Sequence, residues 1–137
     1  MALFQRLQAA IGVRDVARSI AFYAETLGFR VRAERGDPVD FALLERDAVA
    51  LSLVKAKAPA VADFACCYVY VSDVDAVFGD CERAGATIAT PLTRHPWGNK
   101  DFVLRDPDGH RIAIGHVEAH ASHERPVLST RSPPKKG

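Results

Sequence analysis

Residues 10–16 read Ala10-Ile11-Gly12-Val13-Arg14-Asp15-Val16, and residues 68–74 read Tyr68-Val69-Tyr70-Val71-Ser72-Asp73-Val74. In both stretches a β-rich run ends at an aspartate, and a helical pattern begins there. An aspartate is a good N-cap because its carboxylate accepts the unpaired amide hydrogens of the first helical turn. The two stretches therefore predict the same transition from strand to helix twice in one chain.

An amphipathic pattern follows each aspartate. Its apolar residues recur at a spacing of three to four, which is one stripe of a helix: Val16, Ile20, Tyr23 and Leu27 in the first case, and Val74, Val77, Phe78, Cys81 and Ala84 in the second. Gly28 and Gly85 come next, where a left-handed residue costs a glycine least. Each pattern therefore predicts a helix that ends just before a glycine.

Three short β-like runs follow each helix, at about 29–34, 39–45 and 49–54, and again at about 87–90, 101–105 and 111–117. The turn Asp106-Pro107-Asp108-Gly109 joins the last two runs and is a strong hairpin signal. The order βαβββ thus occurs twice, in modules at about 5–56 and 64–118 of a single domain spanning 1–118. We expect an α+β fold in which the two modules face each other and leave a cleft between their sheets.

Composition excludes several classes of protein. The 137 residues carry a formal net charge of +1, which gives no electrostatic reason to bind nucleic acid or an anionic membrane. The three cysteines form no disulfide framework, and no signal peptide or membrane span is visible, so the cytoplasm is expected. The stretch 119–137 lacks periodicity and predicts a flexible tail.

The motifs together resemble the vicinal oxygen chelate superfamily, which includes glyoxalase I, extradiol dioxygenases, fosfomycin-resistance enzymes and bleomycin resistance proteins. The resemblance covers roughly residues 5–118 and rests on the order of Asp15, Phe22-Tyr23, Leu27-Gly28-Phe29, Val71-Ser72-Asp73-Val74-Asp75, Ala84-Gly85-Ala86 and Asp106-Pro107-Asp108-Gly109. It implies tandem βαβββ modules that form a curved mixed sheet around a cavity. It also implies a homodimer in which the sheets of two chains complete two such cavities, with the opening strand at 9–13 in the partner surface.

The enzymes of that superfamily hold a divalent metal with up to four side chains. The matching positions here are Gln8, Ser52, Cys66 and Ala113, which include no histidine and no carboxylate. Hard cations need oxygen donors, preferably charged, and zinc needs several Cys, His or carboxylate ligands. We therefore expect no metal, no cofactor and no catalytic residue. His110 and His116 are read as surface or rim residues.

Within the superfamily the chain most resembles the metal-free bleomycin resistance proteins. The match rests on Trp97-Gly98, Leu104, the Asp106–Gly109 turn and the pair Cys66-Cys67. In those proteins the tryptophan stacks on planar rings of the drug. The resemblance therefore implies a ligand site with Trp97 at its centre, and the residues expected to line it are Trp97, Phe41, Gln8, Ser52, Cys66 and Asn99.

Each of these residues also has a plainer interpretation. Trp97 equally fits a lid packed on its own subunit or on a partner, and a free cysteine such as Cys66 is more often a small buried hydrophobe than a nucleophile. Phe102 is expected to be core. Arg94, His95 and Lys100 near Trp97 favour a neutral or anionic ligand over cationic bleomycin.

Three functions follow, in order of preference. The first is a metal-free binding protein, of the antibiotic-resistance type, that sequesters a small planar ligand in a dimer cavity. The second is a metal-dependent, glyoxalase-like lyase or isomerase, or a dioxygenase, with an atypical metal site. The third is an accessory domain whose cavity is vestigial. The first predicts quenching of Trp97 by ligand, the second predicts bound metal, and the third predicts neither.

Overall fold

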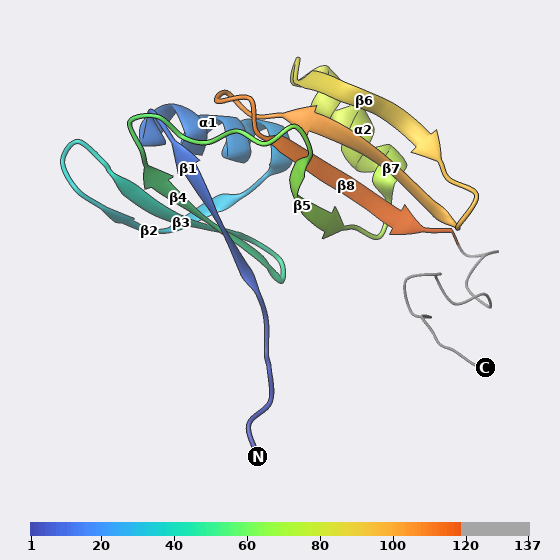
Figure 1. The fold of residues 1–137 in the computed structure, drawn as a ribbon, viewed down its shortest axis with the longest axis horizontal. Helices are drawn as coiled ribbons and strands as arrows, with labels where there is room; N and C mark the ends of the chain where they lie inside the picture. The colour runs from blue at the N-terminus through green and yellow to red at the C-terminus, as the bar shows by residue number, and fades with distance from the viewer. Residues whose placement is uncertain (119–137) are drawn as a thin grey trace.

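The computed structural model describes residues 1–118, and the predicted tail at 119–137 lies outside that part of the chain. Two modules follow one another, each with one helix and four strands (Figure 1). The first contains β1 (Gln8–Val13), α1 (Val16–Leu27), β2 (Arg30–Arg35), β3 (Phe41–Arg46) and β4 (Val49–Lys55). The second contains β5 (Ala65–Tyr70), α2 (Val74–Arg83), β6 (Thr87–Arg94), β7 (Asn99–Arg105) and β8 (Arg111–Val117).

Each module builds its own four-stranded mixed sheet. The strand orders are β1-β4-β3-β2 and β5-β8-β7-β6, and the first and last strand of each module pair in parallel while the other pairs are antiparallel. The α+β class and the tandem βαβββ modules are therefore confirmed. Among the described strands no pairing joins the two sheets. No helix in residues 1–118 is long and apolar enough to cross a membrane.

The two aspartates that opened the repeat do cap the helices. Asp15 accepts a hydrogen bond from the backbone amide of Arg18 at 3.0 Å, and Asp73 accepts one from that of Ala76 at 3.1 Å. Gly28 adopts φ 71° at the end of α1, and Gly85 adopts φ 77° shortly after α2. Local sequence chemistry therefore sets both helix boundaries.

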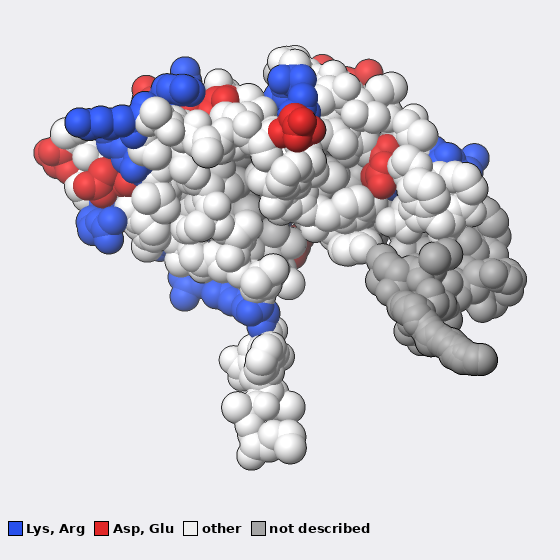
Figure 2. Space-filling view, in the orientation of Figure 1, with Lys and Arg blue, Asp and Glu red and all other residues white. Residues whose placement is uncertain are grey.

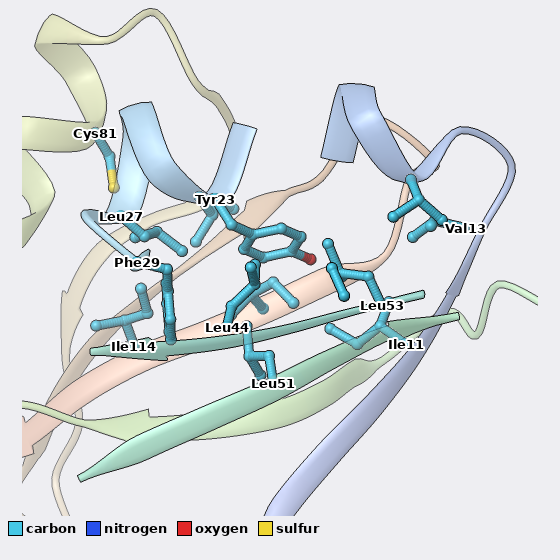
Figure 3. Packing of buried hydrophobic residues seen from close by; sticks show 14 of the residues in the cluster. Ile11, Val13, Tyr23, Leu27, Phe29, Leu44, Leu51, Leu53, Cys81 and Ile114 are labelled. Carbon is cyan, nitrogen blue, oxygen red and sulfur yellow. The ribbon is translucent and has the colours of Figure 1, made fainter. Parts of the chain in front are cut away.

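The core lies between the helices and the sheet faces that they cover. Tyr23 is fully buried beneath α1, where its ring lies beside Phe29, Leu44 and Leu53 (Figure 3). Phe102 is also fully buried, as its sequence context predicted. A single apolar cluster contains residues from both modules. The modules therefore share one core although their sheets are separate.

The Asp106–Gly109 hairpin fastens the second module to the first. Asp106 accepts a hydrogen bond from the Tyr23 hydroxyl at 2.9 Å, and Asp108 accepts from the backbone amide of Arg14 at 3.1 Å. The His110 ring donates from Nε2 to the carbonyl of Gly12 at 2.7 Å and is only 6% exposed. The expectation of a surface histidine at position 110 is therefore wrong, because the hairpin turns inward onto α1 and β1.

Strand β6 is longer than its sequence indicated. It continues to Arg94, and β7 begins at Asn99, because Thr93 pairs with Asp101 and Arg94 pairs with Lys100. Pro91 is tolerated within β6 because this strand is at the edge of its sheet, where one side of the backbone needs no partner. The predicted loop around Trp97 therefore shrinks to a tight turn at the tip of a hairpin.

Candidate functional site

Each sheet has one face that α1 and α2 do not cover, and in the second sheet this face is aromatic. Tyr68 and Tyr70 are two residues apart on β5, so their side chains point to the same side of the sheet. Their ring centroids lie 4.8 Å apart. Tyr70 is 64% exposed and Trp97 is 57% exposed. We call the uncovered face formed by β5, β7, β8 and the turn at 95–98 the aromatic face.

The turn at 95–98 presents Trp97 on a fixed support. The backbone amide of His95 donates to the carbonyl of Asn99 at 2.7 Å, and that of Gly98 donates to the carbonyl of His95 at 3.1 Å. Gly98 has φ 107°, a conformation that favours glycine. The His95 ring stacks on the indole with centroids 4.5 Å apart and planes 7° apart. One face of the indole is therefore backed by imidazole, and the residue remains more than half exposed.

Asp101 holds this support in place. Its carboxylate contacts His95 Nε2 at 2.7 Å and accepts from the Tyr68 hydroxyl at 2.8 Å. The Asn99 amide donates to the same Tyr68 oxygen at 3.1 Å. Sequence reasoning proposed Trp97 and Asn99 but missed His95, Asp101 and Tyr68 as members of the site. The sequence did offer one signal for Asp101: Asn99, Asp101 and Val103 are each two residues apart on one strand, so Asp101 shares a sheet face with the proposed residue Asn99.

Gly115 makes room for this network. A side-chain methyl at position 115 would collide with the Tyr68 hydroxyl and would lie 2.6 Å from the Asp101 Cβ and 2.9 Å from the Lys100 carbonyl oxygen. Only a residue without a side chain lets Tyr68 cross strand β8 and reach Asp101. The glycine is therefore part of the construction of the aromatic face.

Burial, followed by the nearby Asp101 carboxylate, raises the pKa of Tyr68 to about 12, although the hydrogen bond from Asn99 opposes that rise. The phenol is therefore protonated at neutral pH and serves as a donor to Asp101. The network contributes hydrogen-bonding groups but no nucleophile at this residue.

The three basic residues near Trp97 are each paired with a carboxylate. Arg94 donates to Glu118 at 2.8 Å, Lys100 donates to Asp75 at 2.8 Å, and His95 contacts Asp101. The arginine hydrogen bond also holds the pKa of Glu118 below its usual range. The charge around Trp97 is therefore balanced. Of the two expected ligand classes, neutral and anionic, the pairing of the basic residues favours the neutral one.

Three of the predicted site residues lie on the first sheet instead. Gln8, Ser52 and Phe41 belong to β1, β4 and β3, and the strand register places Phe41 and Ser52 on the face that α1 does not cover. Phe41 is half-buried beneath Arg35, whose guanidinium carbon lies 4.8 Å from the ring centroid. Gln8 is exposed, whereas Ser52 is 3% exposed. The described residues show no hydrogen bond between this group and the aromatic face.

Cys66 is exposed, so the expectation of a small buried hydrophobe is wrong. The register between β5 and β8 skips it: Ala65 pairs with Arg111, and Cys67 pairs with Ile112. Such a bulge leaves one residue unpaired and turns its side chain outward. The neighbouring Cys67 thiol lowers the pKa of Cys66 to about 7. The buried cysteine of the chain is Cys81.

The positions that match the superfamily's metal ligands do not fit a metal ion. They supply one amide at Gln8, one hydroxyl at Ser52, one thiol at Cys66 and a methyl group at Ala113. Gln8 and Ser52 are on the first sheet, whereas Cys66 and Ala113 are on the second. This donor set has too few charged ligands for either a hard cation or zinc.

His116 has a structural contact that explains its place. Its Nδ1 accepts a hydrogen bond from the backbone amide of Val74, at the start of α2, at 3.2 Å. His116 thus satisfies an unpaired amide at a helix N-terminus and is half-buried.

This fold defines a class of proteins built from paired βαβββ modules. The chain belongs to the Glyoxalase/Bleomycin resistance protein/Dioxygenase superfamily, whose family model matches residues 5–114. Two curated relatives are an uncharacterized protein of Mycobacterium bovis, Mb0911c, and one of Mycobacterium tuberculosis, Rv0887c. Each is 42% identical over 48 residues, 35% of this chain. The matched stretch spans 32% and 28% of those relatives, about a third of their length.

Similar solved structures share the fold. TioX from Micromonospora sp. ML1 has a TM-score of 0.72 at 24% identity, covering 83% of this chain and 99% of its own. TnmS3, an antibiotic binding protein from Streptomyces sp. CB03234, has a TM-score of 0.71 at 23% identity, covering 86% and 99%. The bleomycin-binding protein of Streptomyces verticillus, complexed with copper(II)-bleomycin, has a TM-score of 0.66 at 22% identity, covering 87% and 99%.

Proposed function

We propose that this chain is a metal-free small-molecule binding protein that sequesters a planar, uncharged ligand against Trp97. The observation that carries the proposal is the indole itself, which is 57% exposed and backed on one side by His95. A large aromatic plane held rigid before the ligand arrives loses little freedom on binding. The related folds of an antibiotic binding protein and a bleomycin-binding protein support the same class of function.

Sequestration requires a second surface to cover the ligand, and a second copy of the chain supplies one. The aromatic face carries exposed Tyr70, Trp97 and Val117, whereas the uncovered face of the first sheet carries Phe41 and Leu43. Charged side chains are densest toward the end of the molecule formed by the outer strands of the first module, and smaller groups of them lie at the top and bottom of the centre of the view (Figure 2). Two copies facing each other would therefore enclose two cavities, each with one wall from either chain.

The opening strand contributes to this dimer differently from the sequence expectation. Ile11 and Val13 are buried in their own core, at 4% and 0% exposure, so their side chains are not available to a partner. Strand β1 is at the edge of its sheet and pairs only with β4 among the described strands. Its free backbone edge, rather than its apolar side chains, is what a second copy would meet.

Titration with neutral fused-ring quinones, with cationic bleomycin as the comparison, tests the ligand site. Trp97 is the single tryptophan of the chain, so its fluorescence reports the site directly. We expect saturable quenching by a neutral ring system. In calorimetry, Trp97→Ala should weaken binding at least about tenfold, or ~1.4 kcal/mol, whereas Trp97→Tyr retains most of the affinity. Equal affinity for wild type and Trp97→Ala would remove the indole from the site.

The second copy is tested by sedimentation equilibrium of the same sample. We expect twice the mass of the chain at micromolar concentration, with or without ligand. If the protein sediments as a monomer and still quenches with ligand, the cavity does not need a partner and that part of the proposal fails.

A further inference from the structure

We propose a second ligand site between the modules, distinct from the Trp97 site, that takes a small apolar ring carrying a protonated amine. A cavity of about 380 Å³ opens between the β3–β4 turn of the first module and the end of β5 with the first turns of α2. This volume is within the usual range for ligand pockets. The cavity shares Tyr70 with the edge of the aromatic face but contains neither Trp97 nor its support, so this site can be tested independently of the proposed function.

The duplication of the chain explains why the cavity exists. When the capping residues Asp15 and Asp73 are aligned, Tyr23 corresponds to Cys81. Figure 3 shows the large ring of Tyr23 filling the space beneath α1, whereas Cys81 on α2 carries only a thiol, which is fully buried and does not itself line the cavity. The same alignment matches Arg14 with Ser72 and Arg18 with Ala76. At each of these positions the second module has the smaller side chain.

The turns that face these residues differ in the same sense. In the second module five residues, 106–110, connect β7 to β8, and they fill the space against the first module. Asp108 contacts both Arg14 and Arg18 there, at 3.3 and 3.5 Å. In the first module only Asp47 and Ala48 connect β3 to β4. The short β3–β4 turn thus faces the smaller side chains of the second module. The space that the longer β7–β8 turn fills on the other side of the molecule therefore stays open here as the cavity.

The chemistry of the lining selects the ligand. The floor is apolar and consists of Leu27, Phe29, Leu51, Val69, Ile112 and Ile114. The rim carries three carboxylates: Asp47 lies 3.9 Å from the Arg46 guanidinium, Asp80 pairs with Arg83, and Asp73 has no ion pair among the described residues. Arg46 already donates to the carbonyl of Leu27 at 2.7 Å. The rim therefore has an excess of negative charge over an apolar floor, which suits an apolar body with a cationic head.

Two of these carboxylates keep capacity for an ammonium group. Asp73 uses Oδ1 to cap α2, and no hydrogen bond to its other oxygen is present among the described residues. Asp80 is paired with Arg83 on the exposed side of α2, and a carboxylate accepts more than one donor. An amine at the mouth of the cavity can therefore be bound without breaking the cap.

The test uses two probes of the same size and opposite charge, phenethylamine and 3-phenylpropanoate, with the full chain followed by ¹⁵N chemical shifts. We expect saturable shifts with the amine at residues 46–49 and 72–80, and weaker binding of the acid by at least about tenfold. Asp73→Asn keeps a capping side chain but removes the charge, and should weaken the amine at least about fivefold. Asp80→Asn, which is exposed, should act in the same direction.

Ala76→Arg copies the first module's Arg18 into the cavity and should abolish binding of the amine, while Trp97→Ala should leave it unchanged. The proposal is overturned if phenethylamine does not saturate, if the acid binds as well, or if Ala76→Arg binds the amine normally. It is also overturned if the shifts appear at residues 95–101, because the amine would then occupy the aromatic face. Should Ala76→Arg fail to fold, undiminished binding by Asp80→Asn and Asp73→Asn is sufficient to reject the site.

Discussion

Asp106→Asn is expected to lower the free energy of unfolding by about 2 kcal/mol, because hydrogen bonds to a buried charged acceptor contribute ~1.5–3 kcal/mol. The carboxylate is 5% exposed and accepts from the Tyr23 hydroxyl at 2.9 Å. It also accepts from the backbone amides of Asp108 at 3.0 Å and His110 at 2.8 Å. The substitution therefore weakens the turn and its attachment to the first module together.

Chemical denaturation followed by circular dichroism measures this loss. Asp47→Asn is the matched control, because Asp47 is in the corresponding turn of the first module and its side chain is 91% exposed. Asn also tolerates the positive φ of 51° at that position. The control should change stability by less than ~0.5 kcal/mol. Equal losses for the two variants would show that the Asp106 hairpin does not hold the modules together.

Gly115→Ala is expected to abolish ligand binding at the aromatic face and to cost about 1–3 kcal/mol of stability, the usual penalty for overpacking. The added methyl group would lie 2.6 Å from the Asp101 Cβ, so Asp101 and Tyr68 must both move. His95 then loses its carboxylate partner, and Trp97 loses the oriented ring behind it. A single added methyl group should thus disturb the Trp97 site through the side chains of Tyr68, Asp101 and His95.

The matched control is Gly12→Ala, which also adds a methyl group within a strand. At that position the new methyl would meet the Cβ atoms of Ala56 at 3.5 Å and Pro59 at 3.7 Å, which are ordinary contacts. Gly12→Ala should therefore keep both the stability and the quenching of Trp97 by ligand. The Tyr68 network would be shown irrelevant to binding if Gly115→Ala quenched with unchanged affinity.

Elements that depend on neighbouring residues could be predicted from sequence. The capping aspartates Asp15 and Asp73, the helices that follow them and the Asp106–Gly109 turn all lie where the residue pattern indicated. Each rests on hydrogen bonds or dihedral preferences within a few residues.

Features that depend on strand register could not be predicted. Strand β6 extends past Pro91 because its partner β7 offers hydrogen bonds there, and Cys66 is exposed because a bulge removes it from the ladder. His110 and His116 are held by a carbonyl and an amide from distant segments. No local pattern marks which backbone groups these side chains will meet.

The sequence by itself determined the duplication, the fold class and the family, because these follow from periodicity and from the spacing of caps and turns. It also supplied the tryptophan and showed that the superfamily's metal positions hold no histidine and no carboxylate. Only the tertiary structure joined Tyr68 to Asp101, which are 33 residues apart, and set His95 behind Trp97. It alone revealed the cavity beside Ser72 and Ala76, whose counterparts Arg14 and Arg18 contact Asp108, because that difference appears only when distant segments pack together.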